Sequence, residues 1–193
     1  MAGRGRVLEL AVLGLLHDAP LHGYELRKRL ATALGPLRAI SYGALYPCLR
    51  DLVDRGWIQQ VGRPANPPLG GRRRRIVYQL TAEGKEELQH LLSEAGPPAW
   101  EDESFGVRFS LFAHTDAEVR LRILEGRRSR LEERREGVRA AMTRARERLD
   151  RYTLELQQHG LESVDREVRW LNELIAHERH GTPGAGHGNG AGS

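Results

Sequence analysis

Residues 72–75 are four consecutive arginines, and this run is the strongest chemical signal in the chain. Like charges so close together repel one another unless an anion neutralises them. We therefore expect Arg72, Arg73 and Arg74 to lie along phosphates or to enter a minor groove of DNA. The alternative is a solvated loop with no partner.

A second group of polar residues begins at Ser41, where Tyr42 and Tyr46 stand on either side of Gly43. Hydroxyl groups bond to phosphates or base edges, and glycine lets a backbone approach its ligand closely. These four residues are candidates for contact with DNA. The alternative that Tyr42 or Tyr46 is a core aromatic, with its hydroxyl at the edge, stays open.

Three helices are expected to position these residues. Residues 7–17 are apolar almost all round, as in a short buried helix, and Pro20 ends it. Residues 23–33 form a second helix, with Leu26 and Leu30 facing inward. On its outer side Tyr24 and Lys28 are placed to contact a phosphate backbone.

The third helix is expected over residues 41–55. Ser41 is a good N-cap, the apolar period places leucines on one stripe, and Gly56 supplies a C-terminal stop. Pro47 conflicts with this helix, because an interior proline removes a hydrogen bond. We keep the helix because the apolar period continues through Pro47.

Two strand-like runs follow, at residues 57–61 and 76–80, and Thr81 then caps a further helix. The loop between the strands, residues 62–75, is long and rich in proline, glycine and arginine, as in a DNA-binding wing. Three helices followed by a hairpin indicate a winged helix-turn-helix. In such a domain the N-terminal part of the third helix enters the major groove.

The C-terminal half predicts long helices. Gly96-Pro97-Pro98 marks a boundary, and Thr115-x-x-Glu118 has the form of a capping box. Steps of four and three residues then define a heptad seam: Ala117, Leu121, Leu124, Arg128, Leu131, Arg135, Val138, Met142, Ala145, Leu149, Tyr152 and Leu156. Gly160 is expected to interrupt the seam, before a second stripe of Leu161, Val164, Val168, Leu171 and Ile175.

A partner subunit is the natural surface to bury these stripes, and Arg128 and Arg135 would pair with Glu132 and Glu136 of the neighbour where the helices do not diverge. The expected fold is therefore mainly α with a small β-hairpin. We expect a winged helix-turn-helix over residues 1–95, a connecting segment with a short aromatic helix over 96–114, a helical dimerisation arm over 115–180 and a disordered tail over 181–193.

Charge and composition agree with a nucleic-acid partner. Residues 1–90 carry 14 basic and 8 acidic side chains, whereas residues 91–193 carry 16 and 18, so the positive excess lies in the first half. Because 28 of the 30 cations are arginine, a compositional bias is the competing explanation. Cys48 is the single cysteine, and no apolar run is long enough to span a membrane, so we expect a cytoplasmic protein.

Three collinear segments, residues 21–26 (LHGYEL), 41–49 (SYGALYPCL) and 71–84 (GRRRRIVYQLTAEG), resemble the PadR family of transcriptional regulators. The resemblance covers about residues 7–92, and the family tolerates proline at position 47. It implies a homodimer that binds double-stranded DNA at a pseudo-palindromic operator, usually as a repressor, with the C-terminal helices as the dimerisation element. Family members often lose DNA affinity on binding a small aromatic compound. The long, proline-rich wing loop departs from the family pattern.

Five aromatic residues are candidates to line an effector pocket between the domains, although aromatics at helical spacing are more often plain core: Trp100, Phe105, Phe109, Phe112 and Trp170. Glu173, His177 and His180 have the spacing of a metal site or of an enzyme, but a solvated helix end is the better interpretation. We expect no cofactor, no metal and no catalysis. The other alternative is a protein-interaction module that uses the helical arm without binding DNA.

Overall fold

The computed structural model describes residues 2–34, 42–61, 76–145 and 150–180, and the side chains of residues 5–32, 43–61, 76–144 and 150–180. Ser41, Arg72, Arg73, Arg74 and the tail 181–193 lie outside these ranges. The chain divides into two compact units, Met1–Asp116 and Ala117–Ser193. No helix of the described ranges is both long and apolar enough to cross a membrane.

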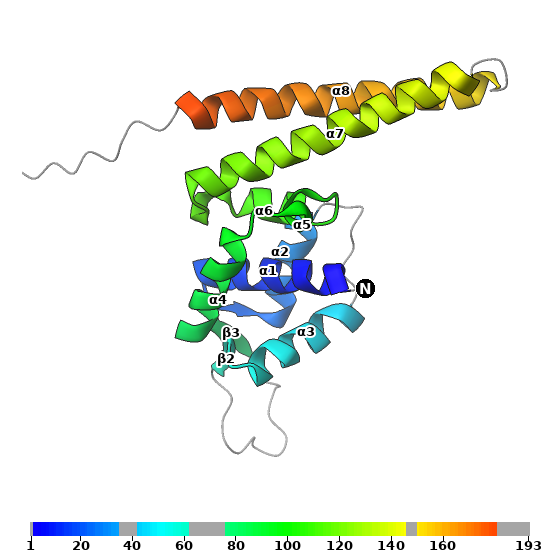
Figure 1. The fold of residues 1–193 in the computed structure, drawn as a ribbon. Coiled ribbons are helices and arrows are strands. Elements are labelled where there is room, and N and C mark those ends of the chain that lie inside the picture. The colour runs from blue at the N-terminus through cyan, green and yellow to red at the C-terminus, as the bar shows by residue number, and fades with distance from the viewer. Residues whose placement is uncertain (1, 35–41, 62–75, 146–149, 181–193) are drawn as a thin grey trace, which may run out of the picture. The chain divides into compact units, whose positions relative to one another are not determined.

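The first unit begins with α1 (Ala2–Asp18), which contacts α2 (Gly23–Leu34), α3 (Tyr42–Asp54) and α4 (Ala82–Ser93). Figure 1 shows α1 as the central helix of this unit. Its residues Leu10–Leu13 and Leu16 are all buried. The apolar sequence that predicted a buried helix is therefore explained by contacts on several sides. The helix also extends to Ala2, five residues before the predicted start.

A three-stranded antiparallel sheet has the order β1-β3-β2, with β1 (Leu21–His22), β2 (Ile58–Val61) and β3 (Val77–Leu80). The predicted hairpin is confirmed, with Ile58 opposite Leu80 and Val61 opposite Val77. The sequence did not indicate β1, which pairs Leu21 with Tyr78. This arrangement of helices and strands is the predicted winged helix-turn-helix.

Thr81 and Gly84 fix the start of α4. The Thr81 hydroxyl oxygen accepts a hydrogen bond from the Gly84 backbone N–H at 3.0 Å, which confirms the predicted cap. A Cβ atom on Gly84 would lie 1.9 Å from the Trp57 carbonyl oxygen. Glycine is therefore required here so that α4 can begin directly against the residue that precedes β2.

After α4 the first unit continues with α5 (Pro97–Trp100), which contains the proline pair, then α6 (Phe105–Ser110) and the 3-10 helix η1 (Phe112–His114). Pro97 begins α5, since proline fits the first turn of a helix, where its missing N–H would have no partner. The segment that follows the predicted boundary is thus packed and helical: α5 contacts α6, which contacts α1 and α2.

The second unit is a hairpin of two long helices, α7 (Ala117–Ala145) and α8 (Arg151–His180), which lie side by side in Figure 1. Arg120 pairs with Glu178 at 2.8 Å and Arg135 with Asp165 at 3.3 Å, so the helices are antiparallel. The prediction of one seam from Ala117 to Leu156 is therefore wrong. A heptad pattern does not distinguish a continuous helix from a hairpin whose two arms are both amphipathic.

The expected interruption at Gly160 is also wrong. Gly160 does not interrupt a helix, because α8 runs through it, and an isolated glycine costs a helix only about 1 kcal/mol. Arg128 and Arg135 find partners within their own chain. The Arg128 guanidinium donates to Asn172 Oδ1 at 3.3 Å, and that of Arg135 lies 3.4 Å from Glu136 and donates to Asp165 Oδ1.

Candidate nucleic-acid interface

The inner face of α3 is anchored in the core of the first unit. Leu45, Leu49 and Leu52 are all buried, which confirms the predicted stripe. The helix runs through Pro47, whose ring is exposed. Because the leucines fix the rotation of α3 about its axis, the opposite face is held outward.

That outer face carries Gly43, Tyr46, Pro47 and Arg50, all exposed. Their spacing of three, four and seven residues from Gly43 places them along one stripe. Tyr46 is 42% exposed, so it is not the buried core aromatic of the alternative interpretation. Tyr42 is the first residue of α3, and its side chain lies outside the described part of the structure.

The ring of Tyr46 packs beside the first turn of α2. A Cβ atom on Gly23 would lie 3.4 Å from the Tyr46 hydroxyl and 3.6 Å from Tyr78, which are ordinary van der Waals distances, so Gly23 lies directly beside both rings. Burial, and secondarily the nearby Tyr46, raise the pKa of Tyr78 above its ordinary value. Tyr78 is therefore a neutral, buried support from β3, and sequence analysis did not single it out.

Helix α2 presents the other two predicted contacts. Leu26 and Leu30 are fully buried, whereas Tyr24 is 69% exposed and Lys28 is exposed. Gly23 connects this helix to Tyr46 of α3, as described above. The structure thus brings Tyr24 and Tyr46 to neighbouring elements of one unit, with their outward orientation set by buried leucines.

The C-terminal end of α3 is closed by a glycine turn. Gly56 has φ +75°, its N–H donates to Val53 O at 3.0 Å, and the Trp57 N–H donates to Leu52 O at 3.0 Å. These two hydrogen bonds form a Schellman motif, so the predicted helix stop at Gly56 is confirmed. Arg55 then pairs with Glu9 of α1 at 3.1 Å and lies over the Trp57 ring, which fixes α3 to α1.

Cys48 lies on α3 between the buried and exposed faces. Burial raises the pKa of its thiol to about 12; Glu9 and Asp51 add to the shift, and Arg55 opposes it. The thiol is therefore neutral near pH 7, which makes it a poor nucleophile and metal ligand.

The first unit also contains a cavity of about 900 Å³, lined by Arg6, Val7, Leu10, Leu91, Glu94, Gly96, Pro98, Ala99, Glu101, Asp102, Glu103, Ser104 and Arg108. None of the five predicted effector residues lines it. Phe105, Phe109 and Phe112 instead contact one another, with ring centroids 5.9 Å and 5.0 Å apart along the series. Trp170 belongs to α8 of the second unit.

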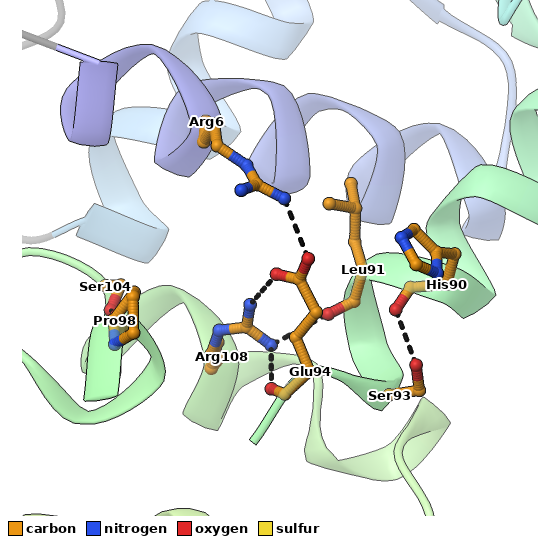
Figure 2. Close-up of polar contacts among 8 residues, drawn as sticks. All are labelled: Arg6, His90, Leu91, Ser93, Glu94, Pro98, Ser104 and Arg108. Carbon is orange, nitrogen blue, oxygen red and sulfur yellow. Dashed lines mark hydrogen bonds and ion pairs between the residues drawn. The ribbon is translucent and has the colours of Figure 1, made fainter. Parts of the chain in front are cut away.

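Figure 2 shows the charged wall of this cavity, where Glu94 lies between Arg6 and Arg108. The Arg108 side chain is 8% exposed, and its guanidinium donates to Leu91 O and Glu94 O at 2.9 Å, two carbonyls at the end of α4. Burial lowers the pKa of Arg108, although Glu94 opposes the shift. Arg108 therefore completes the end of α4, a role that nothing in the sequence indicated.

Across the described residues, no group of three or more histidine, cysteine or acidic side chains is arranged to hold a metal ion. His177 Nδ1 lies 2.8 Å from the carbonyl oxygen of Glu173, one turn earlier on α8. This local contact agrees with the interpretation of these residues as a helix end.

Residues 12–90 match the family described as "Transcriptional regulator PadR-like family". A curated relative, the negative transcriptional regulator PadR of Bacillus subtilis (strain 168), is 33% identical over 92 residues. That match covers 48% of this chain and 48% of the relative, so the chain spans about half the length of the relative it matches.

Among solved structures, Bacillus subtilis PadR in complex with operator DNA is 21% identical, with a TM-score of 0.42, and the match covers 89% of this chain and 99% of that chain. The same protein in complex with p-coumaric acid is 21% identical, with a TM-score of 0.40, and the match covers 90% and 99%. A PadR-like regulator of Bacillus cereus is 20% identical, with a TM-score of 0.40 and coverage of 90% and 99%.

Proposed function

Because residues 12–90 match the PadR-like family of transcriptional regulators, we propose that this protein is a sequence-specific DNA-binding regulator. It acts as a repressor, as the relative described as a negative regulator does. The observation that carries the proposal is the exposed stripe of α3, where Gly43 and Tyr46 face outward from three buried leucines. A helix held in this way is suited to enter a major groove.

The proposed contacts divide between bases and phosphates. Ser41, Tyr42, Gly43 and Tyr46 approach the base edges, and Tyr24 and Lys28 on α2 bind the backbone. Arg72, Arg73 and Arg74 of the wing lie along phosphates or in a minor groove. Support for this division comes from the exposure of Tyr24, Lys28, Gly43 and Tyr46, and from the match of residues 12–90 to a family of regulators.

Assembly is proposed to be homodimeric, through a helical arm over residues 115–180. The support is apolar surface at the start of α8, where Tyr152 is 84% and Leu156 69% exposed. A two-fold dimer buries the same patch on both chains and presents two copies of α3 to a pseudo-palindromic site. A small aromatic effector would release this dimer from DNA. The candidate contacts of the effector are Trp100, Phe105, Phe109, Phe112 and Trp170.

The test is selection of duplexes from a random library by the purified full-length protein, followed by sequencing. The proposal predicts an enriched pseudo-palindromic sequence. Tyr42→Ala and Tyr46→Ala should then weaken binding to the selected duplex more than to an unrelated duplex, because base contacts carry the sequence information. Melting curves confirm that each variant is folded. Equal loss on both duplexes in a folded variant contradicts the assignment, and so does a library that shows no enrichment.

The wing is tested separately with the triple variant Arg72→Ala, Arg73→Ala, Arg74→Ala. Each lost phosphate contact should lower the salt dependence of log K by about 0.9 and weaken all duplexes by similar factors. An unchanged salt dependence would assign these arginines to solvent. The effector proposal predicts that an aromatic acid such as p-coumaric acid, which Bacillus subtilis PadR binds, lowers DNA affinity in the same assay.

A further inference from the structure

The outer stripe of α3 contains one cation, Arg50, which sequence analysis did not single out. It is exposed and lies seven residues after Gly43, two full turns along the same side of the helix. Tyr46 and Pro47 stand between them on the stripe. Arg50 therefore faces the same direction as the residues that are proposed to approach DNA.

The charge of Arg50 is not neutralised within the described part of the chain. Other arginines of this region have partners: Arg29 of α2 pairs with Glu25, and Arg55, which follows α3, pairs with Glu9 and Asp51. Among the described residues, Arg50 has no hydrogen bond, ion pair or ring contact. An exposed guanidinium with no anionic partner among the described residues is available to an external anion.

The length of α3 indicates which part of a duplex Arg50 would reach. Seven residues at about 1.5 Å each separate Gly43 from Arg50 by roughly 10 Å along the axis. The major groove is about 12 Å wide. When Gly43 approaches the base edges on the groove floor, Arg50 lies about one groove width away, where the wall of phosphates begins.

An acidic side chain, Asp54, limits how far the proposed DNA-contact surface of α3 extends. Asp54, one turn beyond Arg50, is the last residue of α3 and is exposed. A carboxylate repels phosphate, so the end of the helix must leave the DNA at this point. Arg50 is thus the last position on the stripe that can hold an anion.

We propose that Arg50 binds a backbone phosphate at the edge of the major groove and so fixes the position of α3 in the groove. The inference rests on the proposed function, because it takes α3 to be the helix that enters the groove. Arg50 is a positioning residue in this account, and the base edges are read by the earlier residues of the helix.

The experiment compares Arg50→Gln, Arg50→Lys and the control Arg166→Gln in the full-length protein. Arg166 is an exposed arginine of α8, also without a hydrogen bond, ion pair or ring contact to any described residue, and its loss changes the net charge equally. Each variant is titrated with the selected duplex and with an unrelated duplex over a series of salt concentrations. Because both positions are exposed, melting temperatures should stay close to the parent value.

Arg50→Gln should weaken binding to both duplexes by the same factor, roughly tenfold, and lower the salt dependence of log K by about 0.9. Arg50→Lys should retain most of the affinity and the full salt dependence, because a phosphate accepts a point charge. Arg166→Gln should match the parent. Loss on the selected duplex alone, with lysine unable to substitute, would make Arg50 a base-reading residue and overturn the inference, as would no effect of Arg50→Gln.

The parent protein separates this inference from the proposed function. A parent that does not distinguish the two duplexes refutes sequence-specific binding itself, whatever Arg50 does. A parent that distinguishes them, with an inert Arg50→Gln variant, refutes only the role of Arg50.

Discussion

The two units of this protein bury different kinds of side chain at their centres. In the first unit the largest fully buried side chains are aliphatic, and leucines of α1, α2, α3 and α4 meet in one cluster, while the buried Arg108 of this unit is not part of that cluster and binds the end of α4. In the second unit Leu124 and Leu171 are buried, but Arg127 is also buried and its guanidinium pairs with Glu167 at 2.8 Å. Arg120 and Arg135 form similar pairs between α7 and α8.

This difference agrees with the functions proposed for the two units. An aliphatic core has no preferred direction, but close packing fixes the helices it joins, and α3 needs a fixed orientation to meet a groove. Arginine–carboxylate pairs are directional and set the register between two helices. They leave apolar surface elsewhere on the hairpin, such as Leu156, for a second chain to cover.

The strongest expected contrast is between two glycines. Gly84→Ala in the first unit should lower the free energy of unfolding by about 3 kcal/mol, because the new methyl group would overlap the Trp57 carbonyl oxygen. Gly160→Ala in α8 should instead raise it by about 0.5–1 kcal/mol, because the space around it is open and alanine favours a helix. Thermal and urea unfolding measure both, and destabilisation by both would contradict the comparison.

Removal of apolar surface from the hairpin should affect assembly more than folding. The double variant Tyr152→Ser, Leu156→Ser should weaken the dimer at least tenfold, since each buried apolar side chain contributes about 1.5–3 kcal/mol. The control is Gln158→Ser, an exposed polar position of the same helix. Sedimentation equilibrium gives the dissociation constants. A double variant as tightly dimeric as the control would place the interface elsewhere.

The ion pairs of the hairpin should differ with burial. A double-mutant cycle on Arg127 and Glu167, whose side chains are 9% and 33% exposed, should give a coupling energy of about 1–2 kcal/mol. The cycle on Arg122 and Glu118, both well exposed, should give less than about 0.5 kcal/mol. Hydrogen exchange of α7 and α8 reports these changes locally. Equal coupling energies would mean that burial does not strengthen these pairs.

Cys48 provides the smallest and most local test. Since burial raises the pKa of its thiol to about 12, alkylation by iodoacetamide at pH 8 should be much slower in the folded than in the unfolded protein. Because the folded pKa is raised, the associated stability is complete below the unfolded pKa of about 8.5 and is lost as pH rises toward 12. Equal alkylation rates would show that the thiol is accessible and ionises normally.

The helices of the first unit were predictable because their signals are local. Leu26 and Leu30, and the leucines of α3, repeat at helical spacing, and Thr81 and Gly56 mark helix ends within a few residues. The strand β1 was not predictable, because Leu21 and His22 are a strand only through pairing with β3, more than 50 residues later.

The hairpin of the second unit was predicted as one continuous seam, although one local signal for its second helix exists. Asp150 Oδ1 accepts hydrogen bonds from the N–H groups of Tyr152 and Thr153, as in a helix cap just before α8. Arg50 was missed for another reason. Whether a surface arginine has an intramolecular partner depends on which carboxylates the fold places beside it, and sequence spacing does not give this.

The central claim is that two chains hold one DNA site through two copies of α3. Sedimentation velocity of the full-length protein with a labelled duplex from the selection tests it most directly, beside a duplex that contains a single half-site. The account predicts two chains on the complete site and binding to the half-site weaker by about 100-fold, because the second contact then loses its effective concentration. One chain bound with equal affinity to both duplexes would contradict it.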